Sequence, residues 1–174
     1  GIESLSITME NPDDCPRYIG GIVKNVQVGP SPEWMVERLK AAGQRSINNL
    51  VDISNYVLLE MGHPTHIFDY DKLEQKEIHI RRAKKGESLT TLDEANHELN
   101  ETQLLITNGK TPIALAGVMG GLDTAVSEET KSVLVESAYF EPVTTRKSAK
   151  SLHMNTDASK RFERGADPEG AVNG

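Results

Sequence analysis

The sequence predicts an α+β fold, in which segments typical of strands are grouped together and flanked by segments typical of helices. Two strand-like segments open the chain, two helical segments follow, and several short strand-like segments precede further helices at the end. A parallel doubly wound sheet would instead alternate strands and helices strictly. A chain of 174 residues is long enough for one core of ordinary size, so we expect one domain, which could divide into two lobes.

The first strands are expected at residues 3–9 and 18–28, where β-branched residues are frequent and apolar side chains alternate with polar ones. Gly20 and Gly21 lie inside the second segment. Because glycine has no side chain, this pair permits a β-bulge or a close approach of another part of the backbone.

The clearest helix follows these strands. Ser31 is a candidate N-cap and Pro32 suits the first turn. Met35, Leu39 and Ala42 then recur at helical spacing, as in a helix with one apolar face. Gly43 can adopt the left-handed conformation that ends such a helix.

A second helix is expected from about Ser46 to Met61, where the Gly-His-Pro sequence that follows would end it. Six apolar residues can share one face of this helix: Ile47, Leu50, Val51, Val57, Leu58 and Met61. Its interior also contains Asp52, Ser54 and Asn55, which are poor helix formers. We therefore expect these polar side chains to have a task other than stabilising the helix.

From residue 77 onward the chain is rich in strand-forming segments with short turns between them. The expected strands are residues 77–83, 88–92, 97–100, 103–107, 112–119 and 132–140. After Glu141 and Pro142 the composition becomes helical, at residues 143–152 and again at 156–165.

The charge of the chain limits how it could contact nucleic acid. With a net charge of −7 and a pI near 5.3, the protein does not have the excess of Lys and Arg that a surface following many phosphates needs. An RNA partner would therefore touch only a small part of this domain. Basic residues gather at 81–85 and at 146–164, and we interpret the first group, which begins with Arg81 and Arg82, as a solvent-exposed face.

The single cysteine, Cys15, excludes an internal disulfide and a thiolate-rich zinc site. A reducing cytoplasm is therefore the simplest compartment, and we expect the thiol to be structural. No run of eighteen apolar residues and no signal-peptide core occurs, so no membrane span is expected. Since the chain starts with Gly1 and ends without a stabilising element, we interpret it as a fragment of a longer chain.

Residues 54–69 form the first candidate site, because Ser54, Asn55, His63, His66 and Asp69 fall around the Gly-His-Pro break. Such breaks place side chains at helix ends and in loops, where sites tend to lie. A lone histidine such as His66 is more often a half-buried structural hydrogen-bonding residue. The spacing of His63, His66 and Asp69 also allows a metal-dependent hydrolase, but the closed motif of a zincin or zinc finger is missing, and we expect no metal.

Three further segments could carry chemistry. Residues 114–121 form a strand that runs into paired glycines, whose backbone N–H groups could approach a ligand, although an ordinary β-turn is the alternative. Glu136 interrupts the apolar strand at 133–140. Its carboxylate would either face solvent or be buried with a partner, because an unpaired buried charge is too costly. Residues 153–168 are rich in hydroxyls and charges, with an exposed amphipathic helix as the alternative.

Four stretches of the sequence carry a family resemblance. In chain order they are CPRYIGGIVKNVQVGPSPEWMVERL, RSINNLVDISNYVLLEMGHPTHIFDYDKL, ALAGVMGG and ESAYFEPVTTRKSAKSLHMNTDASKRFERGADP. Together they resemble the editing region of bacterial phenylalanyl-tRNA synthetase β subunits, over roughly residues 10–170. The resemblance implies that residues 1–174 are a single editing region excised from a longer β subunit, with a mixed β-sandwich core and peripheral helices.

The resemblance also implies a substrate pocket. In that family it is formed by residues that match Arg45, Ser54, Asn55, His66, Gly120, Glu136, Thr156 and Ala158 here. Glu136 and the backbone of Gly120 would receive a tyrosine hydroxyl. The polar residues Ser54, Asn55 and His66 would hold the ester end of the substrate and a water molecule. Ser54 stands where many members of the family have threonine, so the hydroxyl is kept.

The implied activity is hydrolysis of tyrosine wrongly attached to the phenylalanine tRNA. The implied partners are the 3′ end of the aminoacylated tRNA, tyrosine, the α subunit of the synthetase and the remaining β-subunit domains, with no membrane. These residues would need no cofactor, whereas ATP and magnesium would serve the ligation of phenylalanine elsewhere in the full enzyme. The rival hypothesis is a non-catalytic module that binds tRNA or another subunit.

Overall fold

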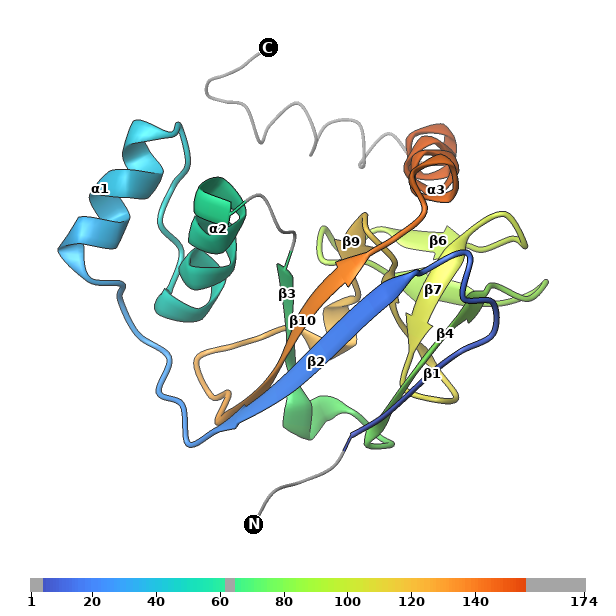
Figure 1. The fold of residues 1–174 in the computed structure, drawn as a ribbon, viewed down its shortest axis with the longest axis horizontal. Helices are drawn as coiled ribbons and strands as arrows, with labels where there is room; N and C mark the ends of the chain where they lie inside the picture. Colours follow the sequence, from blue (N-terminus) through green and yellow to red (C-terminus); the bar gives the residue numbers. More distant parts are fainter. Residues whose placement is uncertain (1–4, 62–64, 156–174) are drawn as a thin grey trace.

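The computed structural model describes residues 5–61 and 65–155, which form packed β-sheets with helices at their periphery (Figure 1). The largest sheet has the strand order β1-β4-β7-β8-β9. Its strands are β1 (Ser6–Met9), β4 (Glu77–Arg82), β7 (Leu104–Thr107), β8 (Pro112–Leu115) and β9 (Met119–Gly120). Because β1 and β4 are parallel and the other pairs are antiparallel, this sheet is mixed.

A second sheet contains three antiparallel strands in the order β2-β10-β3. They are β2 (Arg17–Lys24), β10 (Ser132–Tyr139) and β3 (Thr65–Asp69). The register between β2 and β10 is continuous across Gly20 and Gly21, so the bulge that these glycines permit does not form. A separate pair of short strands, β5 (Ser88–Thr90) and β6 (Asn96–Glu98), forms a third sheet.

The main core lies between the two larger sheets. Tyr18, Phe68 and Leu134 reach it from the three-stranded sheet, and Ile78 and Ile106 reach it from the five-stranded sheet. All five side chains are buried, and burial of apolar surface is the dominant favourable contribution to folding. The two sheets therefore form a sandwich, which confirms the predicted α+β fold with a sandwich-like core.

The peripheral helices are α1 (Glu33–Ala41), α2 (Asn49–Met61) and α3 (Pro142–Asn155). α1 packs on α2, and α2 packs on the edge strand β3, whereas α3 lies at the other end of the molecule and contacts β7 (Figure 1). Gly43 has a φ of 81°, as predicted for the end of α1. Within the described residues, no helix is long and apolar enough to cross a membrane. The helix expected at 156–165 lies outside these residues.

Asp52 explains why the helices begin later than predicted. It is fully buried in α2, and its carboxylate accepts hydrogen bonds from the hydroxyls of Ser31 and Ser46. It also accepts the backbone N–H of Ile47 at 2.8 Å. Ser31 therefore does not cap α1, and α2 begins at residue 49 instead of residue 46. Asp52 thus links the start of α1 to the start of α2. This is a task other than stabilising its own helix, as the sequence predicted for the polar residues of this segment.

The predicted apolar face of α2 is partly wrong. Leu50 is buried, but Ile47 precedes the helix and is 64% exposed, and Leu58 is also exposed. The physical reason is that α2 rests on one edge strand and one short helix, so only a narrow stripe of its surface is covered.

The interpretation of Arg81 and Arg82 as a solvent-exposed face is wrong for Arg81 and only partly right for Arg82, whose side chain is 38% exposed. Arg81 is only 7% exposed, and its guanidinium donates two hydrogen bonds, of 2.8 and 2.6 Å, to the carboxylate of Glu87. Arg82 forms a similar pair with Asp14, at 2.9 and 2.8 Å. Bidentate pairing of this kind allows a guanidinium to be buried at the edge of a core. The neighbouring Lys84 remains exposed.

Candidate functional site

A row of three residues crosses the middle of the three-stranded sheet. Strand pairing places Gly20 of β2, Glu136 of β10 and His66 of β3 side by side. Residues in such a row project from the same face of a sheet. This face is the inner one, because Leu134, which shares it with Glu136, belongs to the core. The carboxylate and the imidazole therefore point into the sandwich. Sequence analysis missed β3 and expected a helix end and a loop at this point.

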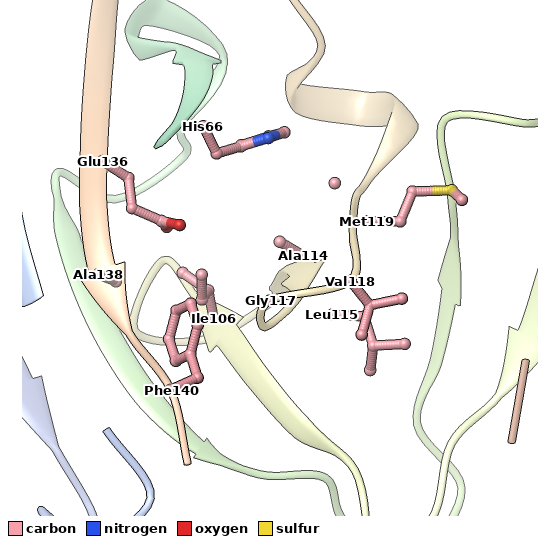
Figure 2. Close-up of a pocket in the computed structure, with 11 residues that line it drawn as sticks. His66, Ile106, Ala114, Leu115, Gly117, Val118, Met119, Glu136, Ala138 and Phe140 are labelled. Carbon is pink, nitrogen blue, oxygen red and sulfur yellow. The ribbon is translucent and has the colours of Figure 1, made fainter. Parts of the chain in front are cut away.

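A cavity of about 150 Å³ opens where these side chains point (Figure 2). Glu136, His66 and Gly120 contribute to its lining. The other contributors are mostly apolar: Ile106, Ala114, Leu115, Gly117, Val118, Met119, Ala138 and Phe140. The hairpin formed by β8 and β9 supplies one wall of the cavity. The single strand expected at 112–119 is wrong, because the chain turns back at residues 116–118 and Gly120 lies in β9. The structure thus brings three of the predicted pocket residues around one cavity.

Glu136 is the charged group of this cavity. Its residue is 5% exposed, and its Oε1 accepts a hydrogen bond of 2.9 Å from the hydroxyl of Tyr18. Burial raises the pKa of Glu136 to about 7, while the hydrogen bond from Tyr18 acts in the opposite direction. Of the two alternatives that the sequence allowed, the buried and partnered carboxylate is the one observed.

His66 is half-buried, as expected, and its ring is held between two neighbours. Phe68 makes an edge contact with it at a centroid distance of 4.4 Å. On another side, a Cβ built on Gly120 would lie 2.6 Å from Nε2 of His66, so any larger residue at this position would have to displace the ring. Burial lowers the pKa of His66 to about 4. The imidazole is therefore neutral near pH 7 and has one nitrogen free of a proton to accept a hydrogen bond.

A second cavity, of about 240 Å³, lies on another side of His66. Ser54 and Asn55 of α2 line it together with His66. The remaining lining residues are Val51, Ile67, Leu92, Ala125 and Val126. His66 thus borders both cavities, with the predicted ester-binding residues on one side and Glu136 with Gly120 on the other.

The remaining predicted site residues are not brought into this group. Arg45 is exposed in the loop between α1 and α2 and lines neither cavity. Thr156 and Ala158 lie outside the described residues, so their place in the pocket stays a prediction.

Asp69 has a structural role that the sequence did not reveal. Its buried carboxylate accepts a hydrogen bond of 2.7 Å from the Thr130 hydroxyl and one of 3.1 Å from the backbone N–H of Asp71. These bonds hold the turn after β3. They occupy the Asp69 carboxylate, which the metal hypothesis would need as a ligand. His63 lies outside the described residues. Among the residues that the structure describes, no three His, Cys, Asp or Glu side chains lie together where they could hold a metal ion.

Tyr18 is the functional candidate that sequence analysis missed. Its partner Glu136 is 118 positions away in the chain, so no local pattern could join them. The one available signal was the alternation of the strand at 18–28, which places Tyr18 on the same face as Gly20. Next to it, Cys15 is fully buried, and burial raises the pKa of its thiol to about 11, as expected for an inert structural cysteine.

The family model described as "B3/4 domain" matches residues 14–174, and the chain belongs to that family. It is 52% identical, over 95% of its length, to the phenylalanine–tRNA ligase β subunit of Carboxydothermus hydrogenoformans, and 53% identical over the same share to that of Geobacillus kaustophilus. These identities confirm the resemblance to bacterial phenylalanyl-tRNA synthetase β subunits. The chain spans 21% of the length of each of these relatives.

A solved structure supports the fold alone. It is an N-terminal fragment of the phenylalanyl-tRNA synthetase β subunit from Pyrococcus horikoshii, which matches with a TM-score of 0.57 and 14% sequence identity. The match covers 87% of this chain and 48% of that fragment.

Proposed function

We propose that this domain hydrolyses the ester that joins tyrosine to the phenylalanine tRNA, as the editing region of a synthetase β subunit. The observation that carries the proposal is Glu136, a buried carboxylate at a small and otherwise largely apolar cavity. The walls would bind the aromatic ring of either phenylalanine or tyrosine, and the carboxylate would accept a hydrogen bond from the hydroxyl that only tyrosine has.

Such a site is needed because the shape of a binding pocket alone discriminates poorly between phenylalanine and tyrosine. A hydrophobic pocket built for phenylalanine discriminates against an added hydroxyl by only about a hundredfold. A second site must therefore bind the hydroxyl positively. A hydrogen bond to a charged group contributes roughly 1.5–3 kcal/mol, and phenylalanine would leave the buried carboxylate without this partner. Correctly charged tRNA would consequently be spared.

The two cavities beside His66 suit the two ends of the substrate. The phenol would occupy the cavity at Glu136 and Gly120, and the ester would lie toward Ser54 and Asn55. In the reaction, the oxygen of water bonds to the ester carbonyl carbon, the bond from that carbon to the ribose oxygen breaks, and the proton lost by water passes to the ribose oxygen. Polar groups that orient the water and stabilise the oxyanion would supply the rate enhancement.

His66 fits the orienting role better than that of a general base. A base works best when its pKa lies near the operating pH, whereas burial lowers the pKa of His66 to about 4. The neutral ring can nevertheless accept a hydrogen bond from the attacking water. A hydroxyl of the terminal ribose of the tRNA would then carry out part of the proton transfer.

The test measures release of the amino acid from tyrosyl-tRNA and phenylalanyl-tRNA by the 174-residue chain. Glu136→Ala should slow tyrosine release by about ten- to a hundredfold and leave phenylalanine release nearly unchanged, with Glu136→Gln between it and the wild type. Glu98→Ala is the matched control, because Glu98 is a strand glutamate that faces solvent. Equal loss for both amino acids in folded protein would contradict the proposal. Binding of tRNA without hydrolysis would favour the non-catalytic module instead.

The wider role of the parent protein is also a proposal, because this chain spans about a fifth of its relatives. In a full synthetase, the remaining β-subunit domains and the α subunit would join phenylalanine to tRNA in the cytoplasm, with ATP and magnesium. The editing region would act on the 3′ end of the product when it carries tyrosine.

A further inference from the structure

Tyr18 approaches Glu136 from behind the candidate site. It lies on β2, next to the strand that carries Glu136, and its hydroxyl donates to Oε1 at 2.9 Å. Both residues are buried. Tyr18 is not among the residues that line the cavity, whereas Glu136 is. Any effect of Tyr18 on a ligand in the cavity must therefore pass through the Glu136 carboxylate.

The hydrogen bond from Tyr18 gives the two oxygens of the Glu136 carboxylate different roles. Oε1 already accepts the hydrogen bond from Tyr18, so Oε2 is the less occupied acceptor for a ligand hydroxyl. A glutamate side chain has three rotatable bonds, and a buried donor on one oxygen reduces the orientations that the group can adopt. Burial also raises the pKa of the Tyr18 phenol, so it stays protonated and remains a donor at any physiological pH.

We propose that Tyr18 is a positioning residue for amino-acid selectivity, which fixes the Glu136 carboxylate so that its second oxygen faces the hydroxyl of a bound tyrosine. This inference rests on the proposed editing function. Tyr18 would make no contact with the substrate itself. Its loss should therefore weaken discrimination between tyrosine and phenylalanine without changing the chemistry at the ester.

The pH dependence provides a signature that simple packing would not give. Among the residues that the structure describes, the ionisable groups that face Glu136 are Tyr18 from β2, Cys15 from the segment before it and His66 from β3. Between pH 5 and 9 Cys15 and Tyr18 stay protonated and His66 stays neutral, since the pKa values of Cys15 and His66 are about 11 and about 4. Glu136, with a pKa of about 7, is the group of this cluster that titrates in that range.

The experiment compares wild type, Tyr18→Phe and Glu136→Gln in kcat and KM for tyrosyl-tRNA and phenylalanyl-tRNA from pH 5 to 9. Tyr18→Phe should lower the tyrosine preference at pH 7 about tenfold, mainly through KM, which is the loss expected for one hydrogen bond to a charged group. It should also move the midpoint of the pH dependence upward, because the Tyr18 hydroxyl lowers the pKa of Glu136. Tyr139→Phe is the matched control, since Tyr139 lies on β10 with 56% exposure.

The outcomes separate the two proposals. If Tyr18→Phe keeps the wild-type preference and midpoint while Glu136→Gln weakens the preference, Tyr18 only packs in the core and the editing function stands. If the wild type shows no preference for tyrosine, the editing function fails and the role of Tyr18 fails with it. Should Tyr18→Phe not fold, the wild type is produced with 3-fluorotyrosine, a stronger donor. The midpoint should then move downward, and an unchanged midpoint would overturn the proposal.

Discussion

Replacing Glu136 by glutamine should change how the stability of the domain depends on pH. Burial raises the pKa of Glu136 from 4.5 to about 7, against the opposing effect of the Tyr18 hydroxyl. Between these two pH values the folded protein holds a proton that the unfolded chain has already released. The free energy of unfolding should therefore fall as the pH rises from 4.5 through about 7.

The magnitude follows from the width of this window. The interval from 4.5 to about 7, at roughly 1.4 kcal/mol for each pH unit, amounts to about 3 kcal/mol. That is a large part of the roughly 5–15 kcal/mol that keeps a domain folded. Glutamine keeps the shape of the side chain and an acceptor oxygen for Tyr18 but does not ionise. From pH 4 to pH 8, Glu136→Gln should gain about 3 kcal/mol of stability relative to the wild type.

Urea unfolding at a series of pH values measures this difference. Glu87→Gln is the matched control with the opposite sign. The hydrogen bonds from Arg81 lower the pKa of Glu87, so its contribution is present above the unfolded pKa and is lost as the pH falls. Glu87→Gln should therefore lose stability relative to the wild type as the pH rises. Parallel pH profiles for the wild type and Glu136→Gln would refute the assignment of a buried, proton-binding carboxylate.

Three further variants test the contacts of the site and its supports. Gly120→Ala should displace the His66 ring, because the new Cβ would lie 2.6 Å from Nε2. Hydrolysis of tyrosyl-tRNA should then fall at least about tenfold. Gly21→Ala is the control and should be neutral, because a Cβ there meets nothing within 4 Å. Equal rates would exclude the close packing of ring and glycine. His66→Ala should slow hydrolysis more than it weakens tyrosine binding, and unchanged turnover would remove His66 from the mechanism. Asp52→Ala leaves three donors without their acceptor and should lower the free energy of unfolding, measured in urea, by about 3 kcal/mol. Glu60→Ala, on the exposed face of the same helix, should lower it by only about a few tenths of a kcal/mol. A fully stable Asp52→Ala protein would contradict the anchoring role of Asp52.

The fold was predictable where local pattern and tertiary structure agree. Most short strands from residue 77 onward lie close to their expected positions, because alternation and turn residues mark them independently of the rest of the chain. The exception is the strand expected at 112–119, which divides into β8 and β9. Helix starts were less predictable, since Asp52 draws Ser31 and Ser46 toward itself. Ser31 lies 21 positions from Asp52, and only the folded chain brings the two together. β3 was missed because five residues after a proline give too little pattern to separate a strand from a loop.

Charge pairing was less predictable the farther apart the two partners lie in the chain. Arg81 and Glu87 are 6 positions apart and face each other across one turn, so their pairing was open to inference from the sequence. Arg82 and Asp14 are 68 positions apart, and nothing local joins them. The same limit applied to Glu136. Its strand was predicted, but whether its carboxylate faced solvent or a partner depended on pairing with β2 and β3.

The energetics of Glu136 favour a functional reason for a carboxylate at this place. At neutral pH the buried carboxyl either retains a proton or pays for charge burial, and glutamine could accept the same hydrogen bond from Tyr18 without that cost. A purely structural position would therefore be more stable with an amide. Sites that bind or catalyse commonly hold groups that lower stability, because the same group supplies an interaction that the ligand needs. A pKa of about 7 also means that a ligand hydroxyl which donates to the carboxylate would shift it toward the charged form, as the Tyr18 hydroxyl already does. Under the proposed function, binding of tyrosine would then release a proton near neutral pH and binding of phenylalanine would not. The selectivity would then originate in the free-energy cost of burying Glu136.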